Sequence, residues 1–382
     1  MKEVRLGDIC DLINGDRGKN YPSGEDFIED GIPFINAGHI QHNNIEFTNM
    51  NYISEEKFRS LGSGKIKKND ILYCLRGSLG KHSLVNINEG AIASSLVIVR
   101  AKGSDIYPKY LNYYLDCDDM YKQQVRFNNG SSQPNLSATN VKQFKVYVPE
   151  YKIQLKIVNI LEKAKNLIYK RKSQIEALDE LVKSRFIEMF GDPVINKNKW
   201  DVKQLADVIT LLNGRAYKQQ ELLKEGRTPV LRVGNFFTNR GWFYSDLELD
   251  EEKYCDDGDL LYAWSASFGP KIWNGGRVIY HYHIWKLVLN EQNINKIYLY
   301  WLLNFLTEFY RTNTHGATML HLTKSEMEKS EIILPPMKLQ NQFADFVKRI
   351  DKLKFEMEKS LKELEDNFNS LMQRAFKGEL FN

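Results

Sequence analysis

An internal duplication constrains the fold of this 382-residue chain more than any other feature. The segment RLGDICDLINGDR, which starts at Arg5, returns as KQLADVITLLNGR from Lys203. Both segments place a Leu-x-Asp triplet ahead of an Asn-Gly pair at the same spacing. A fold for this chain must therefore explain why two distant stretches need the same residues.

The likeness continues in the same order along both halves. GIPFINAGHI (31–40) matches RTPVLRVGNF (227–236), and NDILYCLRGSLGK (69–81) matches GDLLYAWSASFGP (258–270). NGSSQPNLSATNVKQFKVYVP (129–149) then matches HGATMLHLTKSEMEKSEIILP (315–335). A chance likeness would not keep its order over so many segments. The repeating unit is too long for a solenoid repeat, so it predicts duplicated domains.

Each half predicts a mixed α/β domain followed by one long helix. Short β-rich runs separated by turns are DILYCL, SLVIVR and FKVYV in the first half, and DLLYAW, HIWKLVL and EIIL in the second. One or two helices are expected between them. Each half then reaches a proline, Pro149 or Pro335, and enters an apolar-striped helix. We expect domains at 1–150 and 200–336, and long helices at 151–191 and 337–378.

The two long helices carry apolar residues at the 4-3 spacing of a coiled-coil seam. A helix with such a stripe needs a partner, and the helix of the other half is the obvious one. Because both helices follow their domains, an antiparallel pair would put the domains at opposite ends. The alternative is that each stripe packs on its own domain. The predicted seam comprises Ile157, Ile160, Leu167, Leu178, Phe343, Phe346, Leu353 and Leu364.

Composition excludes several classes of protein. Hydrophobic residues make up 42% of the chain and charged residues 27%, which excludes a disordered chain. The net charge of +4 permits a nucleic-acid partner without requiring one. Four scattered cysteines without a CxxC pair predict free thiols in a reducing compartment. No apolar stretch is long enough to span a bilayer, so we expect a cytoplasmic protein without a membrane partner.

The sequence holds no recognisable catalytic motif. It lacks a Walker P-loop, a G-x-S-x-G elbow, an HExxH pair and a deaminase signature. It also lacks the glycine-rich cofactor loop and Pro-Pro-aromatic tetrad of amino-methyltransferases. His281 and His283 could form a metal pair on one face of a strand, but no third ligand lies nearby in sequence. We therefore expect no metal, no cofactor and a binding function, with these histidines at the surface or facing DNA.

Polar loops flanked by glycine recur at strand ends, and they differ between the two halves. They supply side chains that bond base edges and phosphates, on a backbone that glycine allows to approach closely. Two readers with different loops on one scaffold would read two different DNA sequences. The alternative is that these loops are solvated turns. The candidate DNA-binding residues are Arg17, Lys19, Tyr21, Asn36, His39, Arg76, Ser78, Lys81, Gln133, Asn135, Arg215, Tyr217, Lys218, Arg232, Asn235, Arg240, Trp264, Ser265, Lys271 and His315.

Over its whole length the chain resembles a DNA specificity subunit of a type I restriction–modification system. Three pairs of segments carry the resemblance. They are LGDICDLINGDRGK with LADVITLLNGRAYK, VPEYKIQLKIVNIL with LPPMKLQNQFADFV, and LDELVKSRFIEMFGDP with LEDNFNSLMQRAFKGELF. Each motif alone is weak, but their twofold order is specific.

The resemblance implies an α+β fold with an internal pseudo-twofold repeat. Two tandem target recognition domains, similar to that of adenine-specific methyltransferases, would be separated by a long antiparallel two-helix coiled coil. A non-catalytic chain of this kind would read a bipartite site in double-stranded DNA. It would direct to that site two methyltransferase subunits, which bind S-adenosylmethionine, and two ATP-dependent restriction subunits. Within RGSLGK, the residues Arg76, Ser78 and Lys81 are the foremost contact candidates.

Two other functions fit the sequence. One is an adaptor-type specificity protein of another methylation-based phage-defence complex. The other is a duplicated coiled-coil scaffold that does not touch DNA. Binding to DNA with a methyltransferase partner present separates the second from the rest.

Overall fold

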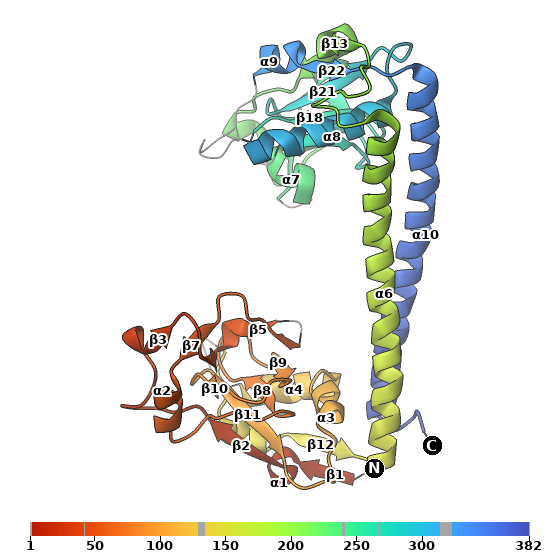
Figure 1. Ribbon diagram of the computed structural model, residues 1–382. Coiled ribbons are helices and arrows are strands. Elements are labelled where there is room, and N and C mark those ends of the chain that lie inside the picture. The colour runs from red at the N-terminus through yellow and green to blue at the C-terminus, as the bar shows by residue number, and fades with distance from the viewer. Residues whose placement is uncertain are drawn as a thin grey trace. The chain divides into compact units, whose positions relative to one another are not determined.

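The computed structural model describes residues 2–41, 43–128, 134–238, 241–265, 268–313 and 323–381. The chain divides into two compact units, each with a domain and parts of two long helices (Figure 1). Unit 1 comprises Met1–Lys172 and Ser360–Asn382, and unit 2 comprises Ser173–Lys359.

The domain of unit 1 is built from small sheets flanked by short helices. β1 (Lys2–Arg5) pairs antiparallel with β12 (Lys145–Val148). One four-stranded sheet has the order β2-β11-β8-β9, made of Cys10–Asn14, Leu96–Ala101, Ile71–Cys74 and His82–Leu84. A second has the order β10-β4-β7-β3, made of Ala91–Ile92, Ile32–Ile35, Asn51–Ile53 and Phe27–Ile28. The remaining elements are β5 (Ile40–Gln41), β6 (Asn44–Ile45), α1 (Leu6–Ile9), α2 (Glu55–Ser60), α3 (Pro108–Tyr114), α4 (Asp118–Phe127) and α5 (Ala138–Lys142).

The domain of unit 2 repeats this plan, except that the short edge strand of its second sheet lies on the opposite edge. β13 (Val202–Gln204) pairs with β22 (Glu331–Ile333). The first four-stranded sheet is β14-β21-β18-β19, made of Ile209–Asn213, Ile284–Leu289, Leu260–Ala263 and Gly269–Ile272. The second is β16-β15-β20-β17, made of Phe243–Ser245, Thr228–Leu231, Val278–Tyr280 and Tyr254–Cys255. Its α-helices are α7 (Val233–Thr238), α8 (Lys296–Asn313) and α9 (Lys324–Lys329), and the 3-10 helix η3 (Leu205–Asp207) corresponds to α1. The predicted mixed α/β domains in tandem are confirmed, and the six predicted strands are all present.

The repeated Leu-x-Asp triplet marks the start of each domain. Leu6 and Leu205 are completely buried. Asp8 and Asp207 each accept a hydrogen bond from the backbone N–H three residues earlier, at 3.3 and 3.0 Å. The aspartate thus satisfies a backbone donor at the start of a short helix while the leucine fills the core. The Leu-x-Asp triplet recurs because each domain begins with a short helix that needs a buried leucine and a capping aspartate.

The repeated Asp of NDILY and GDLLY has an equivalent explanation. It follows a residue in the left-handed region, Asn69 with φ 73° or Gly258 with φ 90°, where glycine and asparagine are favoured. Asp70 and Asp259 each accept the backbone N–H three residues earlier, at 2.7 and 2.9 Å. Each also forms an ion pair across the sheet. Asp70 pairs with Arg100 at 2.7 Å, and Asp259 pairs with Lys286 at 2.6 Å.

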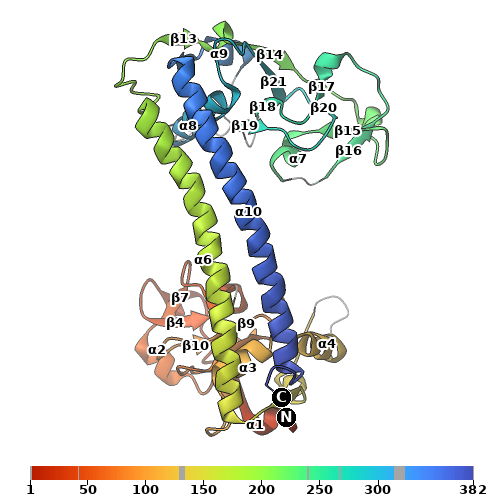
Figure 2. The same ribbon diagram turned by 90° about the vertical axis from the view of Figure 1, so that its right-hand side faces the viewer.

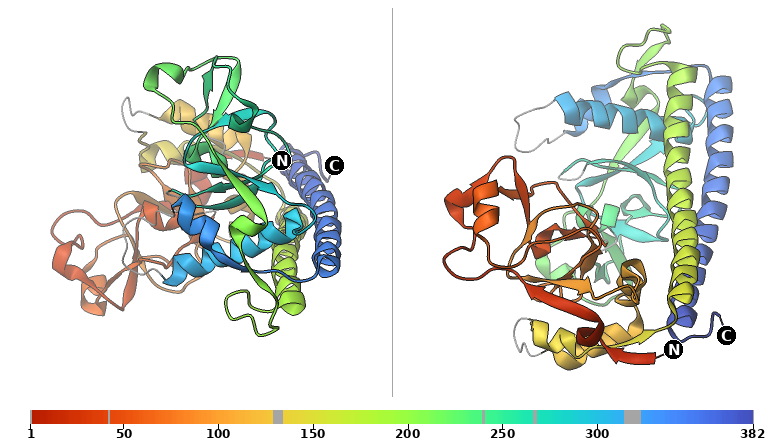
Figure 3. Two further views of the ribbon diagram at one scale, coloured as in Figure 1. Left: turned by 90° about the horizontal axis from the view of Figure 1, so that it is seen from above. Right: turned by 60° about the horizontal axis from the view of Figure 1, so that its bottom comes forward.

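The long helices are α6 (Tyr151–Phe190) and α10 (Met337–Phe376), and they pair antiparallel within each unit (Figures 2 and 3). In unit 1, Lys172 forms an ion pair with Glu365 at 2.8 Å. In unit 2, Asp179 pairs with Lys354 at 2.7 Å, and the Phe186 ring packs edge-on against Phe343. Residue numbers rise along one helix as they fall along the other, so the predicted antiparallel pairing is confirmed.

A buried glutamine fixes the first turn of each long helix to its domain. Gln154 accepts the backbone N–H of Tyr107 at 2.8 Å and donates to the carbonyl of Pro149 at 2.9 Å. Gln340 accepts the N–H of Asn295 at 2.9 Å and donates to the carbonyl of Pro335 at 2.7 Å. Both side chains are completely buried. We call this pair of hydrogen bonds the glutamine clamp. The segment from the proline to the first helical turn recurs in both halves because each copy forms this clamp.

The eight predicted seam residues differ in burial, and the seam itself stays a prediction. Ile157 and Phe343 are buried, and four more are half-buried, namely Ile160, Leu178, Phe346 and Leu364. Leu167 and Leu353 are 54% and 48% exposed, so their placement in the seam is corrected. A helix turns every 3.6 residues, not 3.5, and its inward face therefore drifts along a strict heptad pattern. The neighbouring Ile168 is half-buried instead.

The ends of both stripes also pack into the domains. Val158 and Leu161 of α6, with Met372 and Phe376 of α10, belong to the core of unit 1. In unit 2 the core includes Val182, Phe186 and Phe190 of α6 with Phe343 and Val347 of α10. Among the described residues, no helix is both long and apolar enough to cross a membrane.

Candidate nucleic-acid interface

In the domain of unit 1, a tight turn connects the two four-stranded sheets. It contains Ala93, Ser94 and Ser95 and joins β10 to β11. The N–H of Leu96 closes the turn on the carbonyl of Ala93 at 3.1 Å. The N–H of Ala93 donates to the carbonyl of Ile35 at 2.8 Å, which fixes the turn to β4.

The same turn is present in unit 2 with different residues. His281, Tyr282 and His283 join β20 to β21. The N–H of Ile284 closes this turn on the carbonyl of His281 at 2.9 Å, and the N–H of His281 donates to Leu231 of β15 at 2.9 Å. The backbone arrangement is therefore shared, while Ala-Ser-Ser has become His-Tyr-His.

The repeated Asn-Gly pair is explained by close packing against this turn. A Cβ atom on Gly15 would stand 2.6 Å from the carbonyl oxygen of Ile92. A Cβ atom on Gly214 would collide with the carbonyls of Tyr280 and His281. Only glycine lets the loop after the first sheet strand pass so near the turn. The loop that follows this glycine carries predicted DNA-binding residues in both halves. They are Arg17, Lys19 and Tyr21 after Gly15, and Arg215, Tyr217 and Lys218 after Gly214.

In unit 1, two further loops are bonded to the turn, and a third is bonded to one of these two. The N–H of Ala37 donates to Ser95 Oγ at 3.3 Å, which ties down the loop after β4. The N–H of Leu75, at the end of β8, donates to the carbonyl of Ser95 at 2.9 Å. The carbonyl of Leu75 in turn accepts the N–H of Leu136 at 2.9 Å. The turn thus gathers polar loops that are far apart in sequence.

In unit 2 the turn gathers equivalent loops and an aromatic cluster. The N–H of Trp264 donates to the carbonyl of His283 at 3.0 Å, as Leu75 does in unit 1. Trp264 Nε1 also donates to the carbonyl of Tyr282 at 2.8 Å. The N–H of Arg215 donates to Tyr280 at 3.0 Å, and its carbonyl accepts the N–H of Tyr282 at 3.1 Å. The Tyr217 ring stacks on His281 with centroids 6.3 Å apart.

Burial, together with the nearby His283 and Arg232, lowers the pKa of His281 to about 4. Its imidazole is consequently neutral near pH 7 and can act as one donor and one acceptor. Tyr282 lies between the two histidines in the turn and is 39% exposed.

The predicted contact residues differ widely in exposure. Seven are exposed, namely Arg17, Lys19, Arg76, Ser78, Lys81, Asn135 and Lys218. Another eight are half-buried, namely Tyr21, Asn36, Arg215, Tyr217, Arg232, Trp264, Ser265 and Lys271. Arg76 and Asn135 form an isolated β-bridge, so two of the predicted loops meet. Gln133, Arg240 and His315 lie outside the described residues.

Three of the predicted contact residues cap their own loops, and two of these are buried. His39 is 8% exposed and Asn235 is 2% exposed. His39 Nδ1 accepts the N–H of Asn36 at 3.1 Å, and the Asn36 side chain accepts the N–H of Gly38 at 2.8 Å. Asn235 Oδ1 accepts the N–H of Arg232 at 2.7 Å. The prediction of DNA contacts for His39 and Asn235 is therefore corrected, because their polar atoms satisfy the backbone inside the fold.

Two predicted cations also have internal partners. Lys271 Nζ donates to the carbonyl of Phe236 at 2.6 Å, and burial lowers the pKa of this lysine. Arg215 pairs with Glu221 at 2.8 Å and lies over the Tyr217 ring. These contacts hold the loops of unit 2 in place. They leave the exposed Lys218 as a cation of its first loop that faces solvent.

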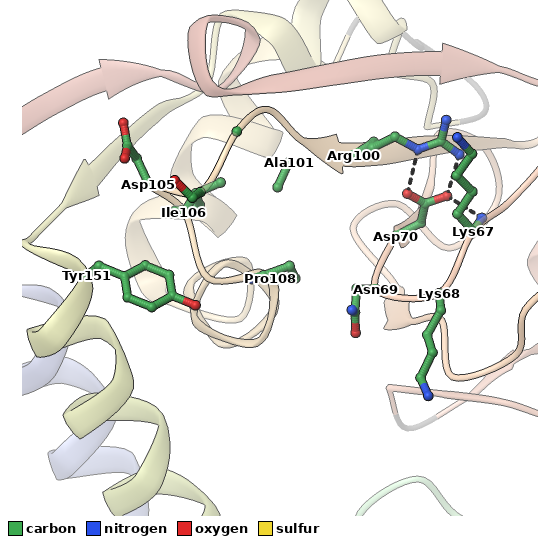
Figure 4. Close-up of a pocket in the computed structure, with 12 residues that line it drawn as sticks. Lys67, Lys68, Asn69, Asp70, Arg100, Ala101, Asp105, Ile106, Pro108 and Tyr151 are labelled. Carbon is green, nitrogen blue, oxygen red and sulfur yellow. Dashed lines mark hydrogen bonds and ion pairs between the residues drawn. The ribbon is translucent and has the colours of Figure 1, made fainter.

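A cavity of about 670 Å³ in unit 1 lies at the other end of β11 (Figure 4). Lys67, Lys68, Arg100 and Tyr151 line it. The dashed lines in Figure 4 mark the bonds of Asp70 with Arg100 and with the N–H of Lys67. Two of the cavity's charged residues, Asp70 and Arg100, form the ion pair that supports the sheet. The turn at 93–95 contributes no residue to this cavity.

The turn residues Ala93, Ser94, Ser95 and Tyr282 are absent from the predicted contact set. Aligning the two halves through β20 and β21 would have paired Ala-Ser-Ser with His-Tyr-His and exposed their difference. His281 and His283 were predicted on one face of a strand, as a possible metal pair or as surface or DNA-facing residues. That strand placement is corrected, because both lie in the turn between β20 and β21. Within the described part of the chain, no group of three or more His, Cys, Asp or Glu side chains could hold a metal ion.

The chain contains two tandem domains with the same arrangement of strands around the turn, and a pair of long helices. The loops bonded to the turn differ between the domains, as expected for a duplicated recognition protein. The chain matches the type I restriction modification DNA specificity domain over residues 1–177 and again over 197–366. The chain therefore belongs to this family. The predicted resemblance is confirmed, and family membership agrees with the prediction of a specificity subunit that is not itself an enzyme.

Individual relatives agree with this assignment. The type I restriction enzyme MjaIX specificity subunit of Methanocaldococcus jannaschii is 23% identical over 98% of this chain and 92% of its own length. A solved chain from a study of complex assembly and conformational transition of the type I restriction–modification system has a TM-score of 0.69 at 16% identity, covering 99% of this chain and 98% of that one. The S subunit from M. genitalium has a TM-score of 0.53 at 15% identity, covering 98% and 96%. These structures share the fold.

Proposed function

We propose that this chain is the specificity subunit of a type I restriction–modification complex. Each domain, within 1–150 and 200–336, reads one half of a bipartite site in double-stranded DNA. The loops gathered on its central turn make the contacts. The helices of 151–191 and 337–378 act as the spacer between the two readers.

One observation carries this proposal. Both domains build the same turn with the same backbone hydrogen bonds, yet the side chains on the turn and its loops differ. A shared scaffold with different polar side chains is what two readers of two different sequences require, because base edges are distinguished by donor and acceptor pattern.

Partners follow from the family. We infer that the subunit brings DNA together with methyltransferase subunits and restriction subunits. In finer detail, two methyltransferase subunits would bind S-adenosylmethionine, and two ATP-dependent subunits would carry out restriction. Free cysteines at four positions, three of them buried, fit a complex that works in the reducing cytoplasm.

A domain exchange tests the proposal. Residues 1–149 are replaced by the equivalent segment of a relative, and the methylated sites of a host carrying the matching methyltransferase are mapped. The expected result is a new sequence in one half of the site, with the other half and the spacer unchanged. The reciprocal exchange of 200–336 serves as the control and should change the opposite half. If either exchange alters both halves, the model of two independent readers is wrong.

A further inference from the structure

The turn at 93–95 and 281–283 is a position where the two domains agree in backbone and disagree in every side chain. Leu75 and Trp264 donate to the third residue of their turns at 2.9 and 3.0 Å. The first residues, Ala93 and His281, donate to the preceding sheet at 2.8 and 2.9 Å. These bonds use backbone atoms only. The side chains are therefore free to change without loss of the turn.

The polar loops of each domain meet at this position. In unit 1 the turn contacts the loop after β4 through Ala37 and the end of β8 through Leu75. In unit 2 it contacts the loop after β14 through Arg215 and the end of β18 through Trp264. A ligand that touches several of these loops at once must also pass the turn between them.

The two turns differ in side-chain size and aromatic character. Ala-Ser-Ser presents small side chains, with Ser94 and Ser95 half-buried, and leaves room beside the exposed Arg76. His-Tyr-His presents a compact ring cluster. Tyr282 lies 4.5 Å from His281 and 3.9 Å from His283 between ring centroids, and Trp264 packs edge-on against His283 at 4.8 Å. Aromatic rings make apolar contacts with bases, notably with the thymine methyl group. Small side chains reach less far from the backbone, so longer side chains of the adjoining loops can contact the bases beside them.

We propose that this turn is a specificity-determining element, whose side chains decide which groups of their own domain contact base edges of its half-site. The inference rests on the proposed function, because it names the residues with which each reader distinguishes bases. In unit 2 the ring cluster of Tyr282 and its neighbours makes the contact. In unit 1 the small turn admits side chains from the adjoining loops.

The test converts the second turn into the first. The variant His281→Ala, Tyr282→Ser, His283→Ser is assembled with the methyltransferase subunits, and methylated sites are mapped beside the wild type. The half-sequence read by unit 2 should lose preference at one to three adjacent positions. Discrimination there should fall by roughly fivefold to a hundredfold, the range for a good base contact. The half-sequence read by unit 1 should not change.

Two further variants keep the result interpretable. Tyr282→Ser alone changes an exposed side chain and should relax the same positions more weakly, even if the triple variant fails to assemble. Val288→Ser is the matched control, because Val288 is 44% exposed near the other end of β21 and should leave both half-sequences unchanged. Full methylation of an unaltered site by the triple or the single variant would refute this inference alone. A wild-type complex without any sequence preference would refute the proposed function as well.

Discussion

The loop between β8 and β9 exposes Arg76, Ser78 and Lys81 on a backbone that two glycines bend. Gly77 and Gly80 have φ of 77° and 78°, in the left-handed region. A Cβ atom on Gly80 would also overlap the side chain of Gln124 in α4. Packing of Gly80 against Gln124 therefore fixes the conformation of the loop backbone, from which the charged side chains extend.

At this scale we predict that Lys81→Glu weakens DNA binding by the assembled complex about tenfold, because it replaces a phosphate-binding cation with a repelling charge. The loss should be similar on all sequences, and the salt dependence of binding should become shallower by about one unit of slope. Titrations of specific and non-specific DNA at several salt concentrations measure both effects.

Lys102→Glu is the control for this charge reversal. Lys102 follows the end of β11 at the opposite end from the turn, and its side chain is 43% exposed. Its Nζ lies 3.5 Å from Asp11 and donates to the carbonyl of Gly7 at 2.8 Å, so the variant's assembly is checked first. The substitution should change affinity little. If Lys81→Glu alters preference at one base position while leaving the salt slope intact, Lys81 contacts a base and not a phosphate.

At the scale of elements, the glutamine clamps connect each domain to its long helix. Gln340 satisfies a backbone donor and a backbone acceptor at once, at Asn295 and Pro335, in a completely buried position. Buried backbone groups that lose their partners cost about 1–3 kcal/mol each. The clamp therefore fixes where α10 begins relative to α8 and β22 within unit 2.

We predict that Gln340→Ala lowers the free energy of unfolding of unit 2 by about 2–4 kcal/mol, because two buried backbone groups lose their bonds and a small cavity forms. All six tryptophans lie at positions 200, 242, 264, 273, 285 and 301, inside unit 2. Denaturant unfolding followed by tryptophan fluorescence therefore reports on this unit. Gln342→Ala, at an exposed position on the same helix, should change the midpoint little. Equal midpoints for the two variants would show that the clamp contributes nothing.

At the scale of the whole molecule, α6 and α10 each begin in one unit and end in the other. If the helices set the distance between the two readers, lengthening both should change the site. One heptad adds ~10 Å of helix. The insertions belong after Lys172 and before Glu365, because these residues pair at 2.8 Å and the seam is then extended on both sides together.

We predict that this double insertion lengthens the non-specific spacer of the methylated site by about three base pairs, or abolishes binding, since three pairs also turn the duplex by roughly 100°. Both half-sequences should stay the same. Methylation mapping of the variant measures the spacer. Inserting the heptad in α6 alone is the control, and it should break the seam and lower assembly. An unchanged spacer at full activity of the double variant would show that the helices do not set the distance.

Much of this architecture follows from local chemistry that the sequence displays directly. Leu6, Asp8 and Gln154 have partners a few residues away or at a fixed place in the repeat, so their recurrence as Leu205, Asp207 and Gln340 predicts two copies of one domain. Short β-rich runs predicted six of the strands, and the apolar stripes predicted the paired helices. These patterns depend on neighbours along the chain, which is why reading the chain in order finds them.

The tertiary structure alone decided which side chains face outward and which loops meet. His39 and Asn235 have the chemistry of DNA-reading residues, but the folded backbone places them as caps in the interior. Leu167 fits the heptad, but the drift of a 3.6-residue helix turns Ile168 inward in its place. Ser95 meets Ala37 and Leu75 only because separate sheets come together there. Such contacts join residues distant along the chain, and three-dimensional packing, not local pattern, fixes them.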